Sequence, residues 1–188
     1  MPEIPGLETF AGETYFSARW PHHPVDFAGK RVGVIGTGST GIQIIPEVAR
    51  EAKHLFVFQR TASFTLPARN RPLDSRFTAE IKARYPEHRE LARQTPSGGL
   101  RPITDRPAFS VPDGERQEIY EDVWQRGGLN FFASFGDLLT NEKANETAAD
   151  FVHTKISQTV RDPRTADLLK PHGYPLGRAA HLSRYGLL

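Results

Sequence analysis

The stretch that decides the fold is Arg31-Val-Gly-Val-Ile-Gly-Thr-Gly-Ser-Thr-Gly41. Residues 32–35 are a short apolar run bounded by glycine, which is typical of a buried parallel strand. After Gly41 the apolar residues keep a helical spacing through about residue 49, with Pro46 tolerable only near the first turn. Residues 55–58 form a second short apolar strand. Residues 30–64 therefore predict a partial Rossmann-like βαβ unit of an α/β fold.

The glycine turn between the first strand and the helix matches G-x-G-x-x-G. In this pattern Gly36 makes the tight turn, Gly38 lets the backbone approach a pyrophosphate, and Gly41 lets helix and strand pack closely. The helix N-terminus adds unpaired N–H groups and a partial positive charge. We therefore expect a dinucleotide at this turn; a purely structural glycine turn is the alternative.

The end of the second strand indicates which dinucleotide binds. An Asp or Glu there would accept a hydrogen bond from a ribose 2′-hydroxyl and repel a 2′-phosphate. The sequence has Gln59-Arg60-Thr61 instead. Arg60 offers a planar fork to a phosphate dianion and Thr61 adds a hydroxyl donor, so NADP(H) is favoured over NAD(H) or FAD. The alternative is that Arg60 is an ordinary solvated arginine.

The rest of the chain divides by composition. Residues 1–29 are an extended, turn-rich lead-in with many prolines and glycines. From about residue 65 no strand of comparable strength appears, so residues 65–170 predict a mostly helical insertion. Helices are expected around residues 77–85, 119–124, 144–160 behind Asn141 as N-cap, and 163–169 behind Asp162, with an irregular loop over 94–114.

Composition excludes several classes of protein. The chain has 188 residues, 38% of them hydrophobic, a net charge of +2 and no cysteine. This predicts a soluble, cytoplasmic globular protein without disulfides or a thiolate metal site. The balanced charge disfavours nucleic-acid binding, and no apolar run is long enough to span a membrane. His22 and His23 lack ligand spacing, so we expect no metal site. No side chain is assigned as catalytic.

The run Phe10-Ala-Gly-Glu-Thr-Tyr-Phe-Ser-Ala-Arg-Trp-Pro21, followed by the glycine turn, resembles the fingerprint F-x-G-x-x-x-H-x-x-x-W-P/D of Baeyer–Villiger monooxygenases. The resemblance covers about residues 3–177 and continues through residues 56–61, 67–70, 145–146, 161–163 and 173–177. It implies an FAD enzyme that uses NADPH and O₂ to insert one oxygen atom next to the carbonyl of a small ketone, or to oxidise a sulfide. It also implies two dinucleotide domains, with a helical insertion in the NADPH domain.

The resemblance also implies roles for residues. Gly36, Gly38 and Gly41 would approach the NADPH pyrophosphate, Thr37, Ser39 and Thr40 would add donors, and Arg60 and Thr61 would hold the 2′-phosphate. Phe10, Gly12, Trp20 and Pro21 would form the linker that couples the cofactor domains. Phe16 stands at the position of the fingerprint histidine, and phenylalanine can neither donate a hydrogen bond nor titrate.

The ends of the resemblance predict a fragment. The family's FAD-binding glycine motif would precede residue 1, and its active-site arginine run is replaced by Arg178-Ala179-Ala180. Residues 183–188 agree with a shifted reading frame of Leu-Asp-Thr-Gly-Tyr-Tyr, which is typical of the family. We hypothesise that residues 171–188 are a truncated, frameshifted tail, without selected structure from about residue 178; the nucleotide sequence tests this.

We therefore expect the NADPH-binding portion of a Baeyer–Villiger monooxygenase, inactive alone, with a complementary FAD-bearing chain as a candidate partner. The alternatives are a noncatalytic NADP-binding module and an unstable gene remnant.

Overall fold

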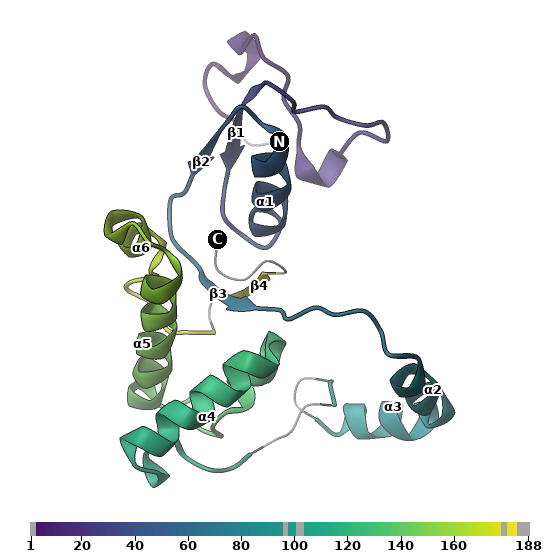
Figure 1. The fold of residues 1–188 in the computed structure, drawn as a ribbon, viewed down its shortest axis with the longest axis vertical. Helices are drawn as coiled ribbons and strands as arrows, with labels where there is room; N and C mark the ends of the chain where they lie inside the picture. The colour runs from purple at the N-terminus through teal and green to yellow at the C-terminus, as the bar shows by residue number, and fades with distance from the viewer. Residues whose placement is uncertain (1–2, 96–97, 101–103, 178–179, 184–188) are drawn as a thin grey trace.

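The computed structural model of this chain describes residues 3–95, 98–100, 104–177 and 180–183. This part of the chain consists of helices and two small parallel sheets of two strands each, which makes the fold α/β (Figure 1). One sheet belongs to the N-terminal half, and the other joins a strand from each half of the chain.

The first sheet forms the expected strand–helix–strand unit. β1 (Arg31–Ile35) and β2 (His54–Phe58) pair in parallel, from Arg31 opposite His54 to Ile35 opposite Phe58, and α1 (Gly41–Glu51) connects them. α1 buries Ile42, Ile45 and Val48. Pro46 lies inside α1, beyond the first turn where it was expected. Because proline lacks an N–H, the helix loses only the bond to the carbonyl four residues earlier and continues.

The face of this sheet that points away from α1 is exposed to solvent. In parallel pairing Ile35, Phe56 and Phe58 share one face, and 78% of Ile35 and 57% of Phe58 are accessible to solvent. Arg31 lies 5.4 Å from the centre of the Phe56 ring at one end of this face. The βαβ unit thus presents an apolar sheet surface that no described segment covers.

The second sheet corrects two expectations. β3 (Phe64–Pro67) pairs in parallel with β4 (Ala180–Ser183). A strand therefore lies at the start of the segment expected to be helical, and another lies in the tail expected to lack structure. β3 has only four residues. Its alternation of buried Phe64 and Leu66 with half-buried Thr65 is therefore too short to predict a strand from the sequence. Residues 178–179 and 184–188 lie outside the described residues, and the frameshift stays a prediction.

The described residues of the second half contain the four predicted helices and one more, α3, which was not predicted. They are α2 (Ser75–Ala83), α3 (Tyr85–Arg93), α4 (Asp113–Arg126), α5 (Glu142–Thr159) and α6 (Pro163–Leu169). Short 3₁₀ helices occur at Leu7–Thr9, Ser17–Arg19, Ala108–Ser110 and Gly128–Ala133. Two predicted caps are confirmed: Asn141 accepts from the N–H groups of Lys143 and Ala144, and Asp162 accepts from that of Thr165.

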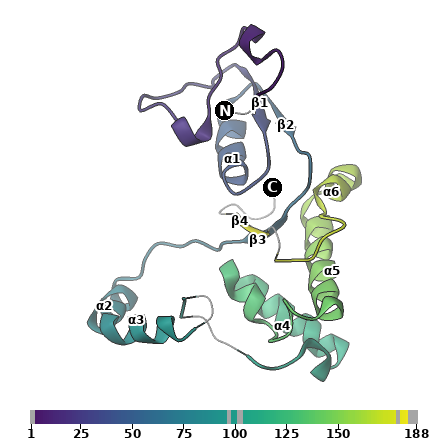
Figure 2. The same cartoon turned by 180° about the vertical axis from the view of Figure 1, so that it is seen from behind.

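The apolar spacing at residues 77–85 does not mark a core helix. The chain leaves the helix at Arg84 and starts α3 at Tyr85, and Phe77 and Tyr85 are both exposed. Neither α2 nor α3 buries a residue. Both views show this pair standing apart from α4, α5 and α6 (Figures 1 and 2).

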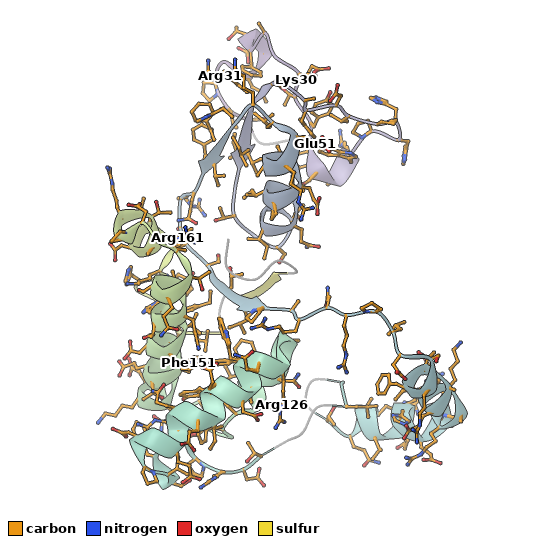
Figure 3. The ribbon with its side chains drawn as sticks, in the orientation of Figure 1. Lys30, Arg31, Glu51, Arg126, Phe151 and Arg161 are labelled. Carbon is orange, nitrogen blue, oxygen red and sulfur yellow. The ribbon has the colours of Figure 1, made fainter. Side chains whose placement is uncertain are left out.

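The core lies between α4, the turn at 128–133 and α5. Tyr120, Trp124, Phe131 and Phe151 form an aromatic cluster, with Phe131 and Phe151 stacked at 5.7 Å between ring centres. Figure 3 shows Phe151 on α5 beside α4. Phe64 and Leu66 of β3 belong to the same core, so β3 joins the first half of the chain to the helices.

Asn145 anchors the segment 171–177 to this core. Its side chain is 6% exposed. The Nδ2 group donates to the Leu138 carbonyl at 3.0 Å and to the Leu176 carbonyl at 2.9 Å, and Oδ1 accepts from the Leu176 N–H at 2.8 Å. One amide therefore satisfies three backbone groups of two separate segments.

His153 makes a second anchor whose strength depends on pH. Its Nε2 donates to the Pro171 carbonyl at 2.8 Å, and its ring stacks on Phe64. Burial lowers the pKa of His153 below its usual value, and the bond to Pro171 only partly opposes this. The unfolded chain therefore takes up a proton before the folded chain does, and stability falls as pH drops through about 6.5.

We expect the free energy of unfolding of the wild type to fall more between pH 7.5 and 5.5 than that of His153→Gln, which keeps an N–H donor without a titrating ring. Urea unfolding at the two pH values measures this. His22→Gln, at an exposed position, is the control and should behave like the wild type. Equal pH dependence of all three proteins would contradict the assignment.

Candidate functional site

The glycine turn lies at the carboxyl ends of β1 and β2. The Gly36 N–H donates to the Phe58 carbonyl at 2.9 Å, which extends the pairing of the two strands by one residue. Gly36 has a φ of 99°, a left-handed conformation that favours glycine. A Cβ on Gly41 would lie 2.3 Å from the Gly36 carbonyl oxygen. The chain itself therefore requires glycine at both positions.

As at Gly36, but unlike at Gly41, no atom lies within 4 Å of the place where the Cβ of Gly38 would be. Its φ is not in the left-handed region, so nothing in the described residues demands glycine there. Open space over the backbone at this position is what the close approach of a ligand needs.

The N-terminus of α1 carries no negative group of its own. Thr40 occupies the N-cap position without a side-chain capping bond, and the first turn has no acidic residue. By contrast, Asp74 caps α2 and Asp162 caps α6 with carboxylates. The positive end of the α1 dipole therefore meets no carboxylate in its first turn, which suits an anionic ligand.

The hydroxyl of Thr37 is bonded within the protein. Its hydroxyl donates to Gln59 Oε1 at 3.1 Å, and both residues are half-buried. A threonine hydroxyl has one proton, so it cannot donate to a ligand at the same time. The expected hydroxyl donor at Thr37 is thus engaged within the protein.

Arg60 and Thr61 follow directly after β2 on the same edge of the sheet as the turn. Gly36 pairs with Phe58 and Thr37 contacts Gln59, so the two segments run side by side. Both Arg60 and Thr61 are exposed. Arg60 has no carboxylate partner in the described part of the chain, so its guanidinium is available to an anion.

A small pocket lies beside the turn. Thr37, Gln59, Ser63 and Thr65 supply polar groups to its wall, and Ile42, Ile156, Val160 and Leu169 supply apolar ones. These residues come from the βαβ unit, β3, α5 and α6, so the helical part of the chain helps to build the surroundings of the turn. Arg161, between α5 and α6, lies at the end of the helical part that faces the βαβ unit (Figure 3).

The residues of the lead-in lie elsewhere. Residues 3–29 sit at the amino ends of β1 and β2, with Lys30 and Arg31 labelled there in Figure 3, and the glycine turn is at the opposite end. Tyr15, Trp20 and Phe27 form an aromatic cluster, and Lys30 pairs with Glu13 at 2.5 Å. The structure therefore does not bring Phe10, Gly12, Phe16, Trp20 or Pro21 to the turn.

Three aromatic side chains of the lead-in are exposed to solvent. Phe10 is 63% accessible, and its ring lies where a Cβ on Gly12 would be, so Gly12 makes room for it. Phe16 and Trp20 are also exposed.

Within the described ranges, no group of three or more His, Cys, Asp or Glu side chains has the arrangement of a metal site. None of the helices there is both long and apolar enough to cross a membrane.

Sequence reasoning missed the residues that join the two halves of the chain. Gln59 Nε2 donates to the Leu168 carbonyl of α6 at 2.8 Å, and the Tyr174 hydroxyl donates to the Ala62 carbonyl. Both pairs are more than 100 residues apart in sequence, and no local pattern signals them.

The chain is similar to flavin-dependent monooxygenases. Residues 1–84 match the family model described as flavin-binding monooxygenase-like. Over 184 residues the chain is 41% identical to 2-oxo-Delta(3)-4,5,5-trimethylcyclopentenylacetyl-CoA monooxygenase of Pseudomonas putida, covering 94% of this chain and 34% of the relative. It is 43% identical over 173 residues to cyclohexanone 1,2-monooxygenase of an Acinetobacter species, covering 91% of this chain and 32% of the relative.

Solved structures give the same result. A steroid monooxygenase bound to NADP superposes with a TM-score of 0.90 at 46% identity, over 98% of this chain and 36% of the other. OTEMO in complex with FAD and NADP superposes with a TM-score of 0.93 at 40% identity, again over 98% and 36%. The chain thus spans about a third of the length of the proteins that it matches.

Proposed function

Because this chain is a relative of the flavin-binding Baeyer–Villiger monooxygenases, we propose that it is the NADPH-binding portion of such an enzyme. The whole enzyme would bind FAD and NADPH and insert one oxygen atom from O₂ next to the carbonyl of a small ketone. Relatives named for cyclohexanone and acetone support that substrate class. The chain alone is inactive in this proposal.

The observation that carries the proposal is the open backbone at Gly38 beside an N-terminus of α1 without acidic residues. The pyrophosphate of NADPH would lie there, bound by main-chain N–H groups of the turn. Arg60 and Thr61, exposed on the neighbouring segment, would hold the 2′-phosphate. Ser39 and Thr40 would add hydroxyl donors to the ligand; the hydroxyl of Thr37 donates to Gln59.

The flavin would supply the oxygen chemistry. No described residue is assigned to it, so the part proposed for this chain is to bind and orient the nicotinamide cofactor. The lead-in residues Phe10, Gly12, Trp20 and Pro21 would couple the two cofactor domains, and Phe16 would not supply the hydrogen bond of the fingerprint histidine.

The exposed apolar face of β1 and β2 supports a role inside a larger assembly. Ile35, Phe56 and Phe58 leave a surface of the kind that parallel sheets normally cover with helices. A complementary FAD-bearing chain is the partner that this proposal requires for activity.

Purification of the 188-residue chain tests the proposal. We expect a colourless protein that binds NADP⁺ in a calorimetric titration and shows no NADPH-driven oxygen uptake. Bound flavin with oxygen uptake would contradict the inactivity of the chain alone. A chain without NADP⁺ affinity that melts without cooperativity would instead favour an unstable remnant.

A pair of glycine variants separates ligand binding from folding at the turn. Gly38→Ala places a Cβ in open space, so its melting temperature should stay near that of the wild type while NADP⁺ affinity falls about tenfold, because the methyl group blocks the approach of the pyrophosphate.

Gly41→Ala places a Cβ against the Gly36 carbonyl and should lower stability by about 1–3 kcal/mol, which thermal unfolding measures. Unchanged NADP⁺ affinity in Gly38→Ala would contradict the site.

A further inference from the structure

Gln59 connects the glycine turn to the helical part of the chain. Its side-chain Oε1 accepts from the Thr37 hydroxyl at 3.1 Å, and its Nε2 donates to the Leu168 carbonyl at 2.8 Å. Thr37 lies inside the turn, and Leu168 lies near the end of α6. One amide thus bridges two elements that are distant in the sequence.

The chemistry of the three groups fixes the direction of this bridge. The Leu168 carbonyl can only accept, so the amide nitrogen of Gln59 must face it. The amide oxygen then faces Thr37, and the hydroxyl of Thr37 must donate. Only one placement of the protons therefore satisfies both hydrogen bonds of the bridge.

A second contact supports the same connection. The Tyr174 hydroxyl donates to the Ala62 carbonyl, so the segment 59–62 is held at its start by α6 and at its end by residues 171–177. This segment contains Arg60 and Thr61. The positions of the turn and of the proposed 2′-phosphate residues therefore depend on the helical part.

We propose that Gln59 is a positioning residue that couples the glycine turn to α6, so that NADP(H) bound at the turn also stabilises α6. This inference rests on the proposed function. Ordering of the turn by the nucleotide holds the Thr37 hydroxyl in place for Gln59, and Gln59 in turn holds the Leu168 carbonyl. Coupling of this kind is reciprocal, so loss of the bridge also weakens nucleotide binding.

Hydrogen exchange of the full chain with and without saturating NADP⁺ tests the coupling. In the wild type, NADP⁺ should slow exchange in residues 163–169. In Gln59→Leu this slowing should be lost, and the dissociation constant for NADP⁺ should rise about 3- to 10-fold, the effect of one net hydrogen bond. Thr37→Val should lose the slowing as well, whereas Thr37→Ser, which keeps the hydroxyl, should retain it.

The matched control is Gln43→Leu. Gln43 also bonds to the turn, donating to the Ser39 carbonyl at 2.7 Å, but its amide group does not bridge to α6. At saturating NADP⁺ its residues 163–169 should be protected as in the wild type. Gln59→Leu with wild-type protection would overturn the coupling while leaving the proposed function intact. A wild type that binds no NADP⁺ would overturn both.

Discussion

Asn145→Leu should cost about 3–5 kcal/mol of unfolding free energy, because it leaves three buried backbone partners unsatisfied while keeping the branched shape and heavy-atom number of the side chain. The leucine cannot bond to the carbonyls of Leu138 and Leu176 or accept from the Leu176 N–H. A domain of ordinary stability would lose a large part of its free energy of unfolding. Urea unfolding followed by circular dichroism measures the loss.

Asn141→Ala on the same helix is the matched control. Asn141 caps α5 at an exposed site, so its removal should cost only about 1 kcal/mol. If Asn145→Leu were no more destabilising than Asn141→Ala, Asn145 would not be the anchor of residues 171–177.

Arg60→Ala should weaken NADP⁺ binding about 10- to 100-fold and leave NAD⁺ binding nearly unchanged, because a charge-assisted pair with phosphate contributes about 1.5–3 kcal/mol. The two nucleotides differ only by the 2′-phosphate, so the ratio of their dissociation constants isolates this contact. Arg60→Lys should fall between the wild type and the alanine variant, since lysine keeps the charge but loses the planar fork.

Arg50→Ala serves as the control for a lost positive charge. Arg50 lies in the last turn of α1 and pairs with Glu47 at 2.6 Å, at the far end of the helix from the glycine turn. It should bind both nucleotides like the wild type. Equal loss of NADP⁺ and NAD⁺ affinity in Arg60→Ala would refute the 2′-phosphate assignment.

Local patterns were sufficient for the βαβ unit and the helix caps. The strand run 32–35, the glycine turn and the caps Asn141 and Asp162 each act within a few residues, so their signals are complete in the sequence. β3 was missed because a four-residue strand depends on its partner β4, which lies at the other end of the chain. Pairing between such distant segments has no local signature.

The helical spacing at residues 77–85 failed for a different reason. Periodicity shows that a helix has an apolar side, but it does not show what that side contacts. Phe77 and Tyr85 are exposed in this chain. Gln59 and Tyr174 were missed for a related reason, since glutamine and tyrosine side chains carry no sequence signal for a bond to a distant carbonyl.

Phosphorus NMR of NADP⁺ titrated with the 188-residue chain tests NADP(H) binding at this turn most directly, because the 2′-phosphate and the pyrophosphate give separate resonances. Binding at the glycine turn and Arg60 predicts that both resonances shift. It also predicts that Arg60→Ala loses the 2′-phosphate shift while keeping the pyrophosphate shift at saturation. A 2′-phosphate resonance that stays unshifted with the wild-type chain at saturating protein would contradict an NADP(H) site here.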